Sequence, residues 1–156
     1  MTICAYQREC LLEGASVAAL VKQVWQELPQ RFPGVVLDEF VVMPNHVHFI
    51  VWITAANENV GAGLALPNKK GAASSAPTLG NVVRAFKSIT AIAINRHLGR
   101  SGTPLWQRNY YEHIIRNEEE LNRLREYIYN NPLRWHLDRE NPNRIGEDVF
   151  ERSVLR

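Results

Sequence analysis

The chain has few cysteines, no long apolar run and no segment typical of secretion. Its 156 residues include only Cys4 and Cys10, too few for a disulfide scaffold or a four-cysteine zinc site. We interpret both as free thiols in a reducing compartment. The longest apolar candidate, Phe40 to Ile53, is interrupted by polar residues and a proline, so no membrane span is expected. The N-terminus lacks the basic and apolar segments of a signal peptide. We therefore expect a cytoplasmic protein without a membrane partner.

Acidic residues are scarce in one region, although the net charge of the whole chain is only +2. Between Thr78 and Arg116 the single acid is Glu112. The same stretch carries six cationic residues: Arg84, Lys87, Arg96, Arg100, Arg108 and Arg116. A local cationic excess suits a polyanion such as nucleic acid better than a neutral metabolite. A solvated basic face without a ligand is the alternative, and charge alone does not decide between them.

Hydrophobic periodicity predicts the order strand, helix, strand, strand in the first third of the chain. The first strand covers Thr2–Tyr6, and apolar residues at helical spacing from Val17 to Leu28 predict a helix that Pro29 and Pro33 close. Val35–Val42 and His46–Ile53 then form two strands. Their short link, Met43-Pro44-Asn45, predicts an antiparallel hairpin.

The rest of the chain predicts helix, strand and helix. Thr54–Pro77 is rich in Ala, Gly, Asn, Ser and Pro, so we expect a flexible insertion within a single domain covering residues 1–156. A helix over Thr78–Leu98 ends at Gly99, and Pro104–Ile115 is predicted to be a strand. Asn117 caps the last helix, with Glu120 in capping-box position. Pro132 stops this helix near Asn130, and a polar tail follows from about residue 135.

This order is typical of a ferredoxin-like α+β fold, in which an antiparallel sheet carries helices on one face. The last helix is an addition to that pattern.

His46 and His48 are the first candidates for chemistry. Residues two apart on a strand point to the same face, so both imidazoles can reach one ion or one phosphate. Two histidines leave a metal site incomplete. A pair of partly buried strand histidines satisfied by neighbouring groups is the alternative, and this pair alone does not exclude it.

Tyr127 and Asn131 lie four residues apart, on one face of the last helix. Asn131 offers a carbonyl oxygen as a hard ligand, and Tyr127 offers a phenol that becomes a strong nucleophile as the phenolate. The two histidines with Asn131 could hold a divalent ion that orients a phosphate for attack. Simple packing of Tyr127 beside the apolar stripe of its helix remains an alternative.

Other histidine chemistries lack their motifs. A histidine-triad hydrolase needs a third histidine two residues after His48, where the chain has Ile50, and no second His-X-Thr/Ser element is present for a two-histidine phosphoesterase. No P-loop or Rossmann glycine pattern occurs.

Four segments in order resemble the REP-associated tyrosine transposases, a branch of the single-tyrosine HUH transposases of bacterial insertion sequences. They are Met43–Phe49, Phe86–Ser88, Leu105–Arg116 and Glu126–Pro132. The His-X-His pair is weak evidence by itself, whereas the ordered set is strong. Family members usually carry more residues before the first strand than this chain does.

The resemblance implies an HUH nuclease fold in a bacterial, nucleoid-associated enzyme. It implies that His46, His48 and Asn131 bind Mg²⁺ or Mn²⁺. It implies further that Tyr127 attacks a DNA phosphate, which gives a 5′-phosphotyrosine link and a free 3′-hydroxyl. The implied substrates are single strands with palindromic hairpins, and the enzyme is a monomer or a homodimer.

We select a small set of residues for DNA contact. The cationic side chains would bind phosphates, and the aromatic ones would stack on unpaired bases, although strand packing is the alternative for the aromatic residues. The set is Arg84, Lys87, Arg108, Tyr110, Tyr111 and Arg116. Two rival functions stay open: a non-catalytic hairpin-binding protein, and a metal phosphodiesterase that uses water.

Overall fold

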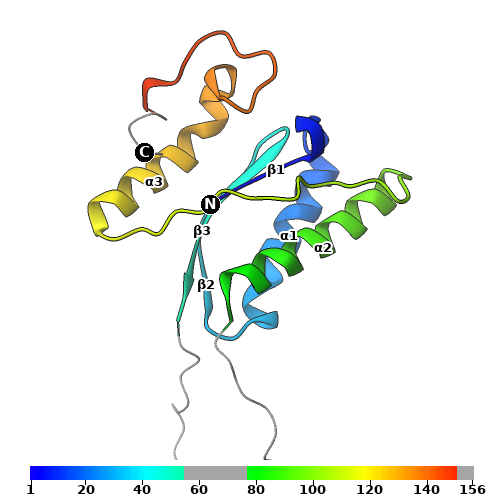
Figure 1. Ribbon diagram of the computed structural model, residues 1–156, viewed down its shortest axis with the longest axis horizontal. Helices are drawn as coiled ribbons and strands as arrows, with labels where there is room; N and C mark the ends of the chain where they lie inside the picture. Colours follow the sequence, from blue (N-terminus) through cyan, green and yellow to red (C-terminus); the bar gives the residue numbers. More distant parts are fainter. Residues whose placement is uncertain (55–76, 151–156) are drawn as a thin grey trace, which may run out of the picture.

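The computed structural model describes residues 1–54 and 77–150, so nearly all of the predicted insertion at Thr54–Pro77 lies outside the described residues. Figure 1 shows a small sheet between two groups of helices. The strands and α-helices, in chain order, are β1 (Thr2–Cys4), α1 (Ala15–Arg31), β2 (Val35–Val42), β3 (His46–Ile53), α2 (Leu79–His97) and α3 (Glu118–Asn130). Two 3₁₀ turns cover Tyr6–Arg8 and Asn131–Leu137. The described helices include none that is long and apolar enough to cross a bilayer.

The sheet is antiparallel, in the order β1-β3-β2, and this confirms the predicted α+β class. The central strand β3 pairs with β2 along most of its length but with β1 only at His46–His48. Met1 extends that short pairing by exchanging two backbone hydrogen bonds with Phe49. Beyond Phe49, the β1 side of β3 has no neighbouring strand among the described residues.

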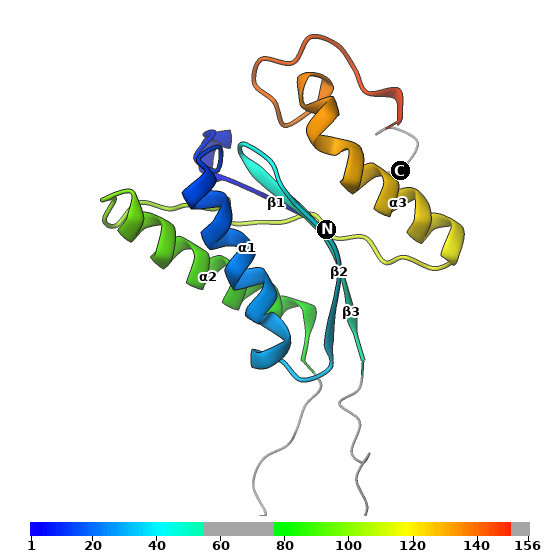
Figure 2. The same ribbon diagram turned by 180° about the vertical axis from the view of Figure 1, so that it is seen from behind.

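The side chains on the two faces of β3 pack into different clusters, because side chains alternate along a strand. Val47 and Phe49 point into the main core, which α1 and α2 cover with residues such as Trp25 and Phe86. On the opposite face Ile50 joins a second cluster with residues of α3: Leu121, Leu124, Tyr127 and Ile128. Figure 2 shows α1 and α2 on one side of the sheet and α3 on the other. His46 and His48 share the α3 face with Ile50.

The predicted cap at Asn117 is confirmed, and α2 carries a further cap at Thr78 that the sequence analysis did not name. The Thr78 side chain accepts a hydrogen bond from the Asn81 N–H at the start of α2. At α3, Asn117 Oδ1 accepts from the Glu120 N–H at 2.8 Å. The Glu120 carboxylate in turn accepts from the Arg116 N–H at 2.9 Å. Capping at both positions satisfies N–H groups that the first turn of a helix leaves without partners.

The first helix ends at Arg31, between the two prolines predicted to close it, so Pro29 lies inside α1. A proline in the last turn removes one backbone bond only. The buried stripe that reaches Leu28 keeps this turn on the core.

The predicted strand over Pro104–Ile115 is also wrong as a regular element. The segment runs beside β1 and forms isolated bridges at Ala5–Trp106 and Thr2–Tyr111. The two bridges are farther apart on this segment than on β1, so its residues bulge out between them and the ladder breaks. The Lys87 ammonium holds the bulge by donating to the carbonyls of Gln107 and Arg108 at 2.6 and 3.0 Å.

The tail after α3 is more ordered than its polarity predicts. Pro132 ends the α-helix but is compatible with the first turn of the 3₁₀ segment that follows. Further on, Asp138, Glu140 and Asp148 are buried, and Phe150 packs against the α3 cluster. The segment after residue 137 therefore folds back onto the α3 face of the sheet.

Candidate active site

His46 and His48 meet on the α3 face of β3. Both imidazoles are buried, and their Nε2 atoms lie 2.9 Å apart. Their ring planes cross at 78°, so the two nitrogens approach edge to edge rather than by stacking. The predicted juxtaposition of the two rings is therefore present.

Asn45 fixes the ring orientation of His46. Its Nδ2 donates to two backbone carbonyls, those of Arg8 and Glu140, at 3.1 and 2.7 Å. Its Oδ1 therefore accepts from His46 Nδ1 at 2.8 Å. With its proton on Nδ1, His46 presents an unprotonated Nε2 to the site, the form that binds metals.

Thr2 contacts the Nδ1 atom of His48, as Asn45 contacts that of His46. Its hydroxyl lies 2.9 Å from His48 Nδ1. A hydroxyl can donate or accept, so it can hold either tautomer of this ring. When the ring donates from Nδ1 to Thr2, His48 Nε2 is free to bind an ion. Thr2 and Asn45 are thus outer partners that the sequence analysis did not identify.

Both histidines are held neutral. Burial, with a smaller contribution from Arg139, lowers the pKa of His46 to about 3. Burial and the neighbouring His46 lower the pKa of His48 well below its ordinary value. Neutral imidazoles can bind a cation without first releasing a proton.

Asp138 is the candidate ligand that the sequence analysis missed. Its Oδ2 lies 3.6 Å from His46 Nε2, and the ligand atoms of Asp138, His46 and His48 all lie within 4.8 Å of one another. The Glu140 N–H donates to the other oxygen at 2.7 Å, so Oδ2 faces the histidines. Since His46 is neutral, this contact is no ion pair. Two histidine nitrogens and a carboxylate oxygen form an electron-rich buried cluster that could bind a metal ion.

Burial raises the pKa of the Asp138 carboxyl to about 6. The group is therefore mostly ionised at neutral pH, while burial disfavours the charge. A cation beside the carboxylate would offset that cost.

Asn131, the predicted third ligand, is buried at the end of α3. Neither its Oδ1 nor its Nδ2 has a hydrogen-bond partner among the described residues. An unpaired buried amide is costly and usually has a partner. An oxygen-binding cation could be a partner for the amide oxygen, but Asn131 as a third ligand stays a prediction.

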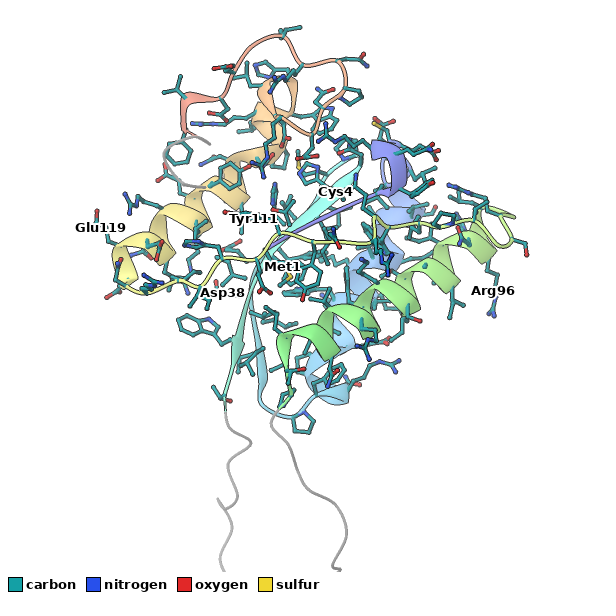
Figure 3. The ribbon with its side chains drawn as sticks, in the orientation of Figure 1. Met1, Cys4, Asp38, Arg96, Tyr111 and Glu119 are labelled. Atoms are coloured by element: carbon teal, nitrogen blue, oxygen red, sulfur yellow. The ribbon has the colours of Figure 1, made fainter. Side chains whose placement is uncertain are left out.

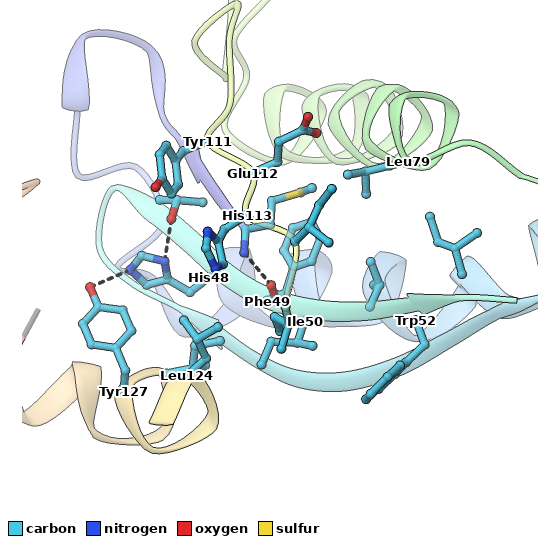
Figure 4. Close-up of a pocket in the computed structure, with 17 residues that line it drawn as sticks. His48, Phe49, Ile50, Trp52, Leu79, Tyr111, Glu112, His113, Leu124 and Tyr127 are labelled. Atoms are coloured by element: carbon cyan, nitrogen blue, oxygen red, sulfur yellow. Dashed lines mark hydrogen bonds between the residues drawn. The ribbon is translucent and has the colours of Figure 1, made fainter. Parts of the chain in front are cut away.

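Tyr127 reaches the histidines from α3. Its side chain is only 3% exposed, and its hydroxyl lies 3.5 Å from His48 Nε2. The tyrosine and histidine rings meet edge to face, with centroids 5.3 Å apart. Tyr127 therefore approaches the histidines of its own chain, and Figure 4 shows the hydroxyl aimed at the His48 ring.

An ion pair fixes α3 on the sheet one half-turn away from Tyr127. Arg125 Nε and Nη2 donate to the two carboxylate oxygens of Asp38 on β2, at 2.9 and 2.6 Å. Trp52 Nε1 donates to the same carboxylate at 2.8 Å. The Arg125 guanidinium and the Trp52 N–H lower the pKa of Asp38, so the carboxylate stays ionised. Such a two-bond pair restricts both the height and the rotation of a helix.

The predicted DNA contacts do not lie on one face. Arg84 and Lys87 belong to α2, on the far side of the sheet from Tyr127, and the Lys87 ammonium is bonded to backbone carbonyls. Figure 3 shows Arg96 far along α2 and Glu119 on α3, on opposite sides of the sheet. Arg108 and Arg116 are exposed. Whether any of these residues binds DNA stays a prediction.

The two predicted stacking aromatics differ in environment. Tyr110 packs against the main core. Tyr111 is 41% exposed and lines a cavity beside His48 and Tyr127. His113 lines the same cavity and bonds to Glu120 at 2.7 Å.

A sequence relative comes from Haemophilus influenzae strain Rd. This uncharacterised protein is 38% identical over 152 residues, which cover 88% of the present chain and 81% of the relative. No family model matches the chain.

Two solved structures share the fold. One is a REP-associated tyrosine transposase bound to a REP hairpin, with a TM-score of 0.58 and 19% identity. The alignment covers 86% of the present chain, which spans less than two thirds, 65%, of that protein's chain. The other is a candidate transposase from Deinococcus radiodurans R1, with a TM-score of 0.51 and 22% identity over 83% of this chain and 86% of its own.

Proposed function

We propose that this chain, which belongs to one family with the Haemophilus influenzae protein and has the fold of a REP-associated tyrosine transposase, is a DNA-processing enzyme of the HUH class. In this proposal it nicks single-stranded DNA next to hairpins and rejoins the ends through a covalent tyrosine link. One observation carries the proposal. The Tyr127 hydroxyl lies 3.5 Å from Nε2 of His48, which forms a buried cluster with His46 and Asp138.

The proposed reaction needs a nucleophile, a group of residues that holds a divalent ion, and partners that orient the imidazoles of that group. Tyr127 supplies the nucleophile. Its oxygen would form a bond to phosphorus while the bond from phosphorus to the 3′ oxygen breaks. The phenol gives up its proton and the leaving 3′ oxygen gains one, so the step balances without water. The reverse attack by a 3′-hydroxyl rejoins DNA, because the phosphotyrosine link keeps the energy of the broken ester.

The cluster of His46, His48 and Asp138 would hold the divalent ion, Mg²⁺ or Mn²⁺, and the partnerless amide oxygen of Asn131 would be a further ligand. When bound, such an ion would polarise a phosphate oxygen as a Lewis acid. Asn45 and Thr2 would orient the two imidazoles through their Nδ1 atoms, in the manner of outer partners at metal sites.

We also propose a substrate and an oligomeric state for this enzyme. We propose hairpin-bearing single-stranded DNA as partner, since the solved transposase of this fold is bound to a REP hairpin. One copy of the chain supplies both the histidines and the tyrosine, so a monomer suffices for the nicking step. We place the protein in the bacterial cytoplasm, with one catalytic domain across residues 1–156.

The direct test is covalent capture. The protein is incubated with a hairpin oligonucleotide labelled at its 3′ end, the side that stays linked to the tyrosine, and Mn²⁺, then denatured and separated by size. We expect labelled DNA to migrate with the protein, and EDTA to abolish this band. Labelled DNA that is bound before denaturation but never after it would support a hairpin-binding protein instead. Cleaved products without a protein-linked species would support a water-using phosphodiesterase.

The ion pair between Asp38 and Arg125 predicts a coupling that the same assay measures. We expect Asp38→Asn and Arg125→Gln each to slow adduct formation by roughly 10- to 100-fold, because small displacements of a reacting group are costly. The double variant should be no slower than the worse single variant, as for two members of one contact. Arg123→Gln, which changes an exposed residue of the same helix, is the control. Independent, multiplying losses from the two variants would contradict a shared positioning role.

A further inference from the structure

A cavity of about 310 Å³ opens directly beside the proposed nucleophile. His48 and Tyr127 line one end of it, and Trp52 and Leu79 line the other. Its size lies at the small end of the range for ligand pockets, which suits a single nucleobase with part of its sugar. The cavity is therefore continuous with the atoms that would attack a phosphate.

The walls of the cavity are mainly apolar and aromatic. Ile50 lies on its floor, Leu124 and Ile128 come from α3, and Ile115 and Tyr111 come from the bulged segment. The Tyr111 ring is 41% exposed, and the Arg139 guanidinium lies 5.9 Å from its centroid. Flat apolar space beside an accessible aromatic ring is the environment in which unpaired bases stack.

The open edge of β3 adds polar groups to this wall. Phe49 exchanges two hydrogen bonds with Met1, so its backbone groups point to the β1 side. In an antiparallel strand every second residue points the same way. The N–H and C=O groups of Val51 therefore face the side where the described residues place no neighbouring strand. Such groups can bond to the edge of a base.

The charge around the cavity favours a base over a second phosphate. Glu112 is the one acid among its described lining residues, and Figure 4 shows its carboxylate turned outward. A neutral base avoids repulsion from that acid. In the proposed function the attacked phosphate would lie at the His48 end of the cavity, beside the Tyr127 hydroxyl and the ion that the cluster would hold.

We infer that this cavity binds the base of a nucleotide adjoining the phosphate that Tyr127 attacks. The inference rests on the proposed function, and it specifies how that site would select its cleavage position. A base seated between Tyr111 and Ile50 would fix the register of the strand, so that only one phosphate reaches Tyr127.

The test removes bases rather than phosphates. Tyr127→Phe protein, which binds without chemistry, is titrated with hairpin oligonucleotides that each lack one base in the single-stranded flanks. We expect one abasic position to weaken binding by roughly 5- to 100-fold, the range of base stacking on aromatic side chains. Adding Tyr111→Leu should shrink that penalty to near zero. Adding Tyr129→Leu, which alters a tyrosine 76% exposed on α3 and outside the cavity, should leave the penalty intact.

A second variant fills the cavity instead of emptying it. We expect Ile115→Trp to weaken binding of the intact oligonucleotide and to spare the abasic one. The melting temperature of each variant shows whether it folds. The inference would be overturned if no abasic position weakened binding. It would also be overturned if the loss of affinity at an abasic position were unchanged by Tyr111→Leu and Ile115→Trp. If wild-type protein forms adducts while no abasic position weakens binding, the cavity assignment fails and the nuclease stands. If the penalty appears but wild-type protein forms no adduct, the base site stands and the proposed chemistry fails.

Discussion

Replacing Tyr127 with phenylalanine is expected to abolish the protein–DNA adduct while leaving the fold and the cluster of His46, His48 and Asp138 intact. Loss of a nucleophile removes the bond-forming atom itself, so we expect adduct formation to fall by on the order of 10⁴-fold or more. The ring that packs among Leu124 and Ile128 remains. The hydroxyl contact to His48, at 3.5 Å, is long for a hydrogen bond and contributes little to stability. The measurement is the rate of covalent capture of a labelled hairpin oligonucleotide.

Tyr129→Phe is the matched control for this change. It removes the same atom from a tyrosine on the same helix whose side chain is 76% exposed, and we expect a rate equal to that of the wild-type protein. Mn²⁺ affinity, measured by calorimetry, should be unchanged in both variants. Cleavage that survives Tyr127→Phe and disappears in His46→Ala would instead indicate attack by water.

Replacing Asp138 with asparagine is expected to give the second-largest effect, on metal binding. The variant keeps the shape of the side chain and an oxygen for the Glu140 N–H, but it loses the charge. Even outer groups at metal sites change affinity by 10- to 100-fold. A charged direct ligand should therefore matter at least that much, and we expect a drop of roughly 100-fold in Mn²⁺ affinity with a matching loss of adduct.

Two further variants make the Asp138 result specific. Asp148→Asn neutralises another buried carboxylate, one that pairs with Arg134 outside the cluster, and it should leave Mn²⁺ affinity unchanged. Asn131→Ala should weaken binding by less than Asp138→Asn, because a neutral amide oxygen attracts a cation less than a carboxylate does. Wild-type affinity in Asp138→Asn together with a large loss in Asn131→Ala would restore the ligand set predicted from the sequence and leave Asp138 a structural role.

The elements that sequence could predict are those whose signals are local. The alternation along His46–Ile53 predicted which side chains share a face, and the structure gathers His46, His48 and Ile50 there. The cap at Asn117 was predictable because its partner N–H lies only three residues along the chain. Helical spacing predicted that Tyr127 and Asn131 share one face, and both residues are buried, Tyr127 in α3 and Asn131 just after its end.

The features that sequence could not predict depend on distant segments. Asp138 stands in a polar stretch without periodicity, and only the return of the chain onto β3 brings it to His46, 92 positions earlier in the sequence. Lys87 was predicted to bind phosphate because it belongs to the cationic stretch Thr78–Arg116. The sequence could not show that the bulged segment around Gln107 also gives this ammonium backbone carbonyls as partners. That bulge also explains why the strand predicted over Pro104–Ile115 forms only two isolated bridges.

The return of the tail onto β3 has a consequence for when the cluster of His46, His48 and Asp138 can form during synthesis. The Asn45 amide that orients His46 is anchored to the carbonyl of Glu140, and Asp138 belongs to the same late segment. A chain still on the ribosome can form the sheet, α1 and α2, because proteins acquire structure from the N-terminus during synthesis. It cannot complete the cluster of His46, His48 and Asp138 until residue 140 has left the exit tunnel. Under the proposed function, nascent or prematurely terminated chains would thus carry both histidines and Tyr127 without the complete metal site.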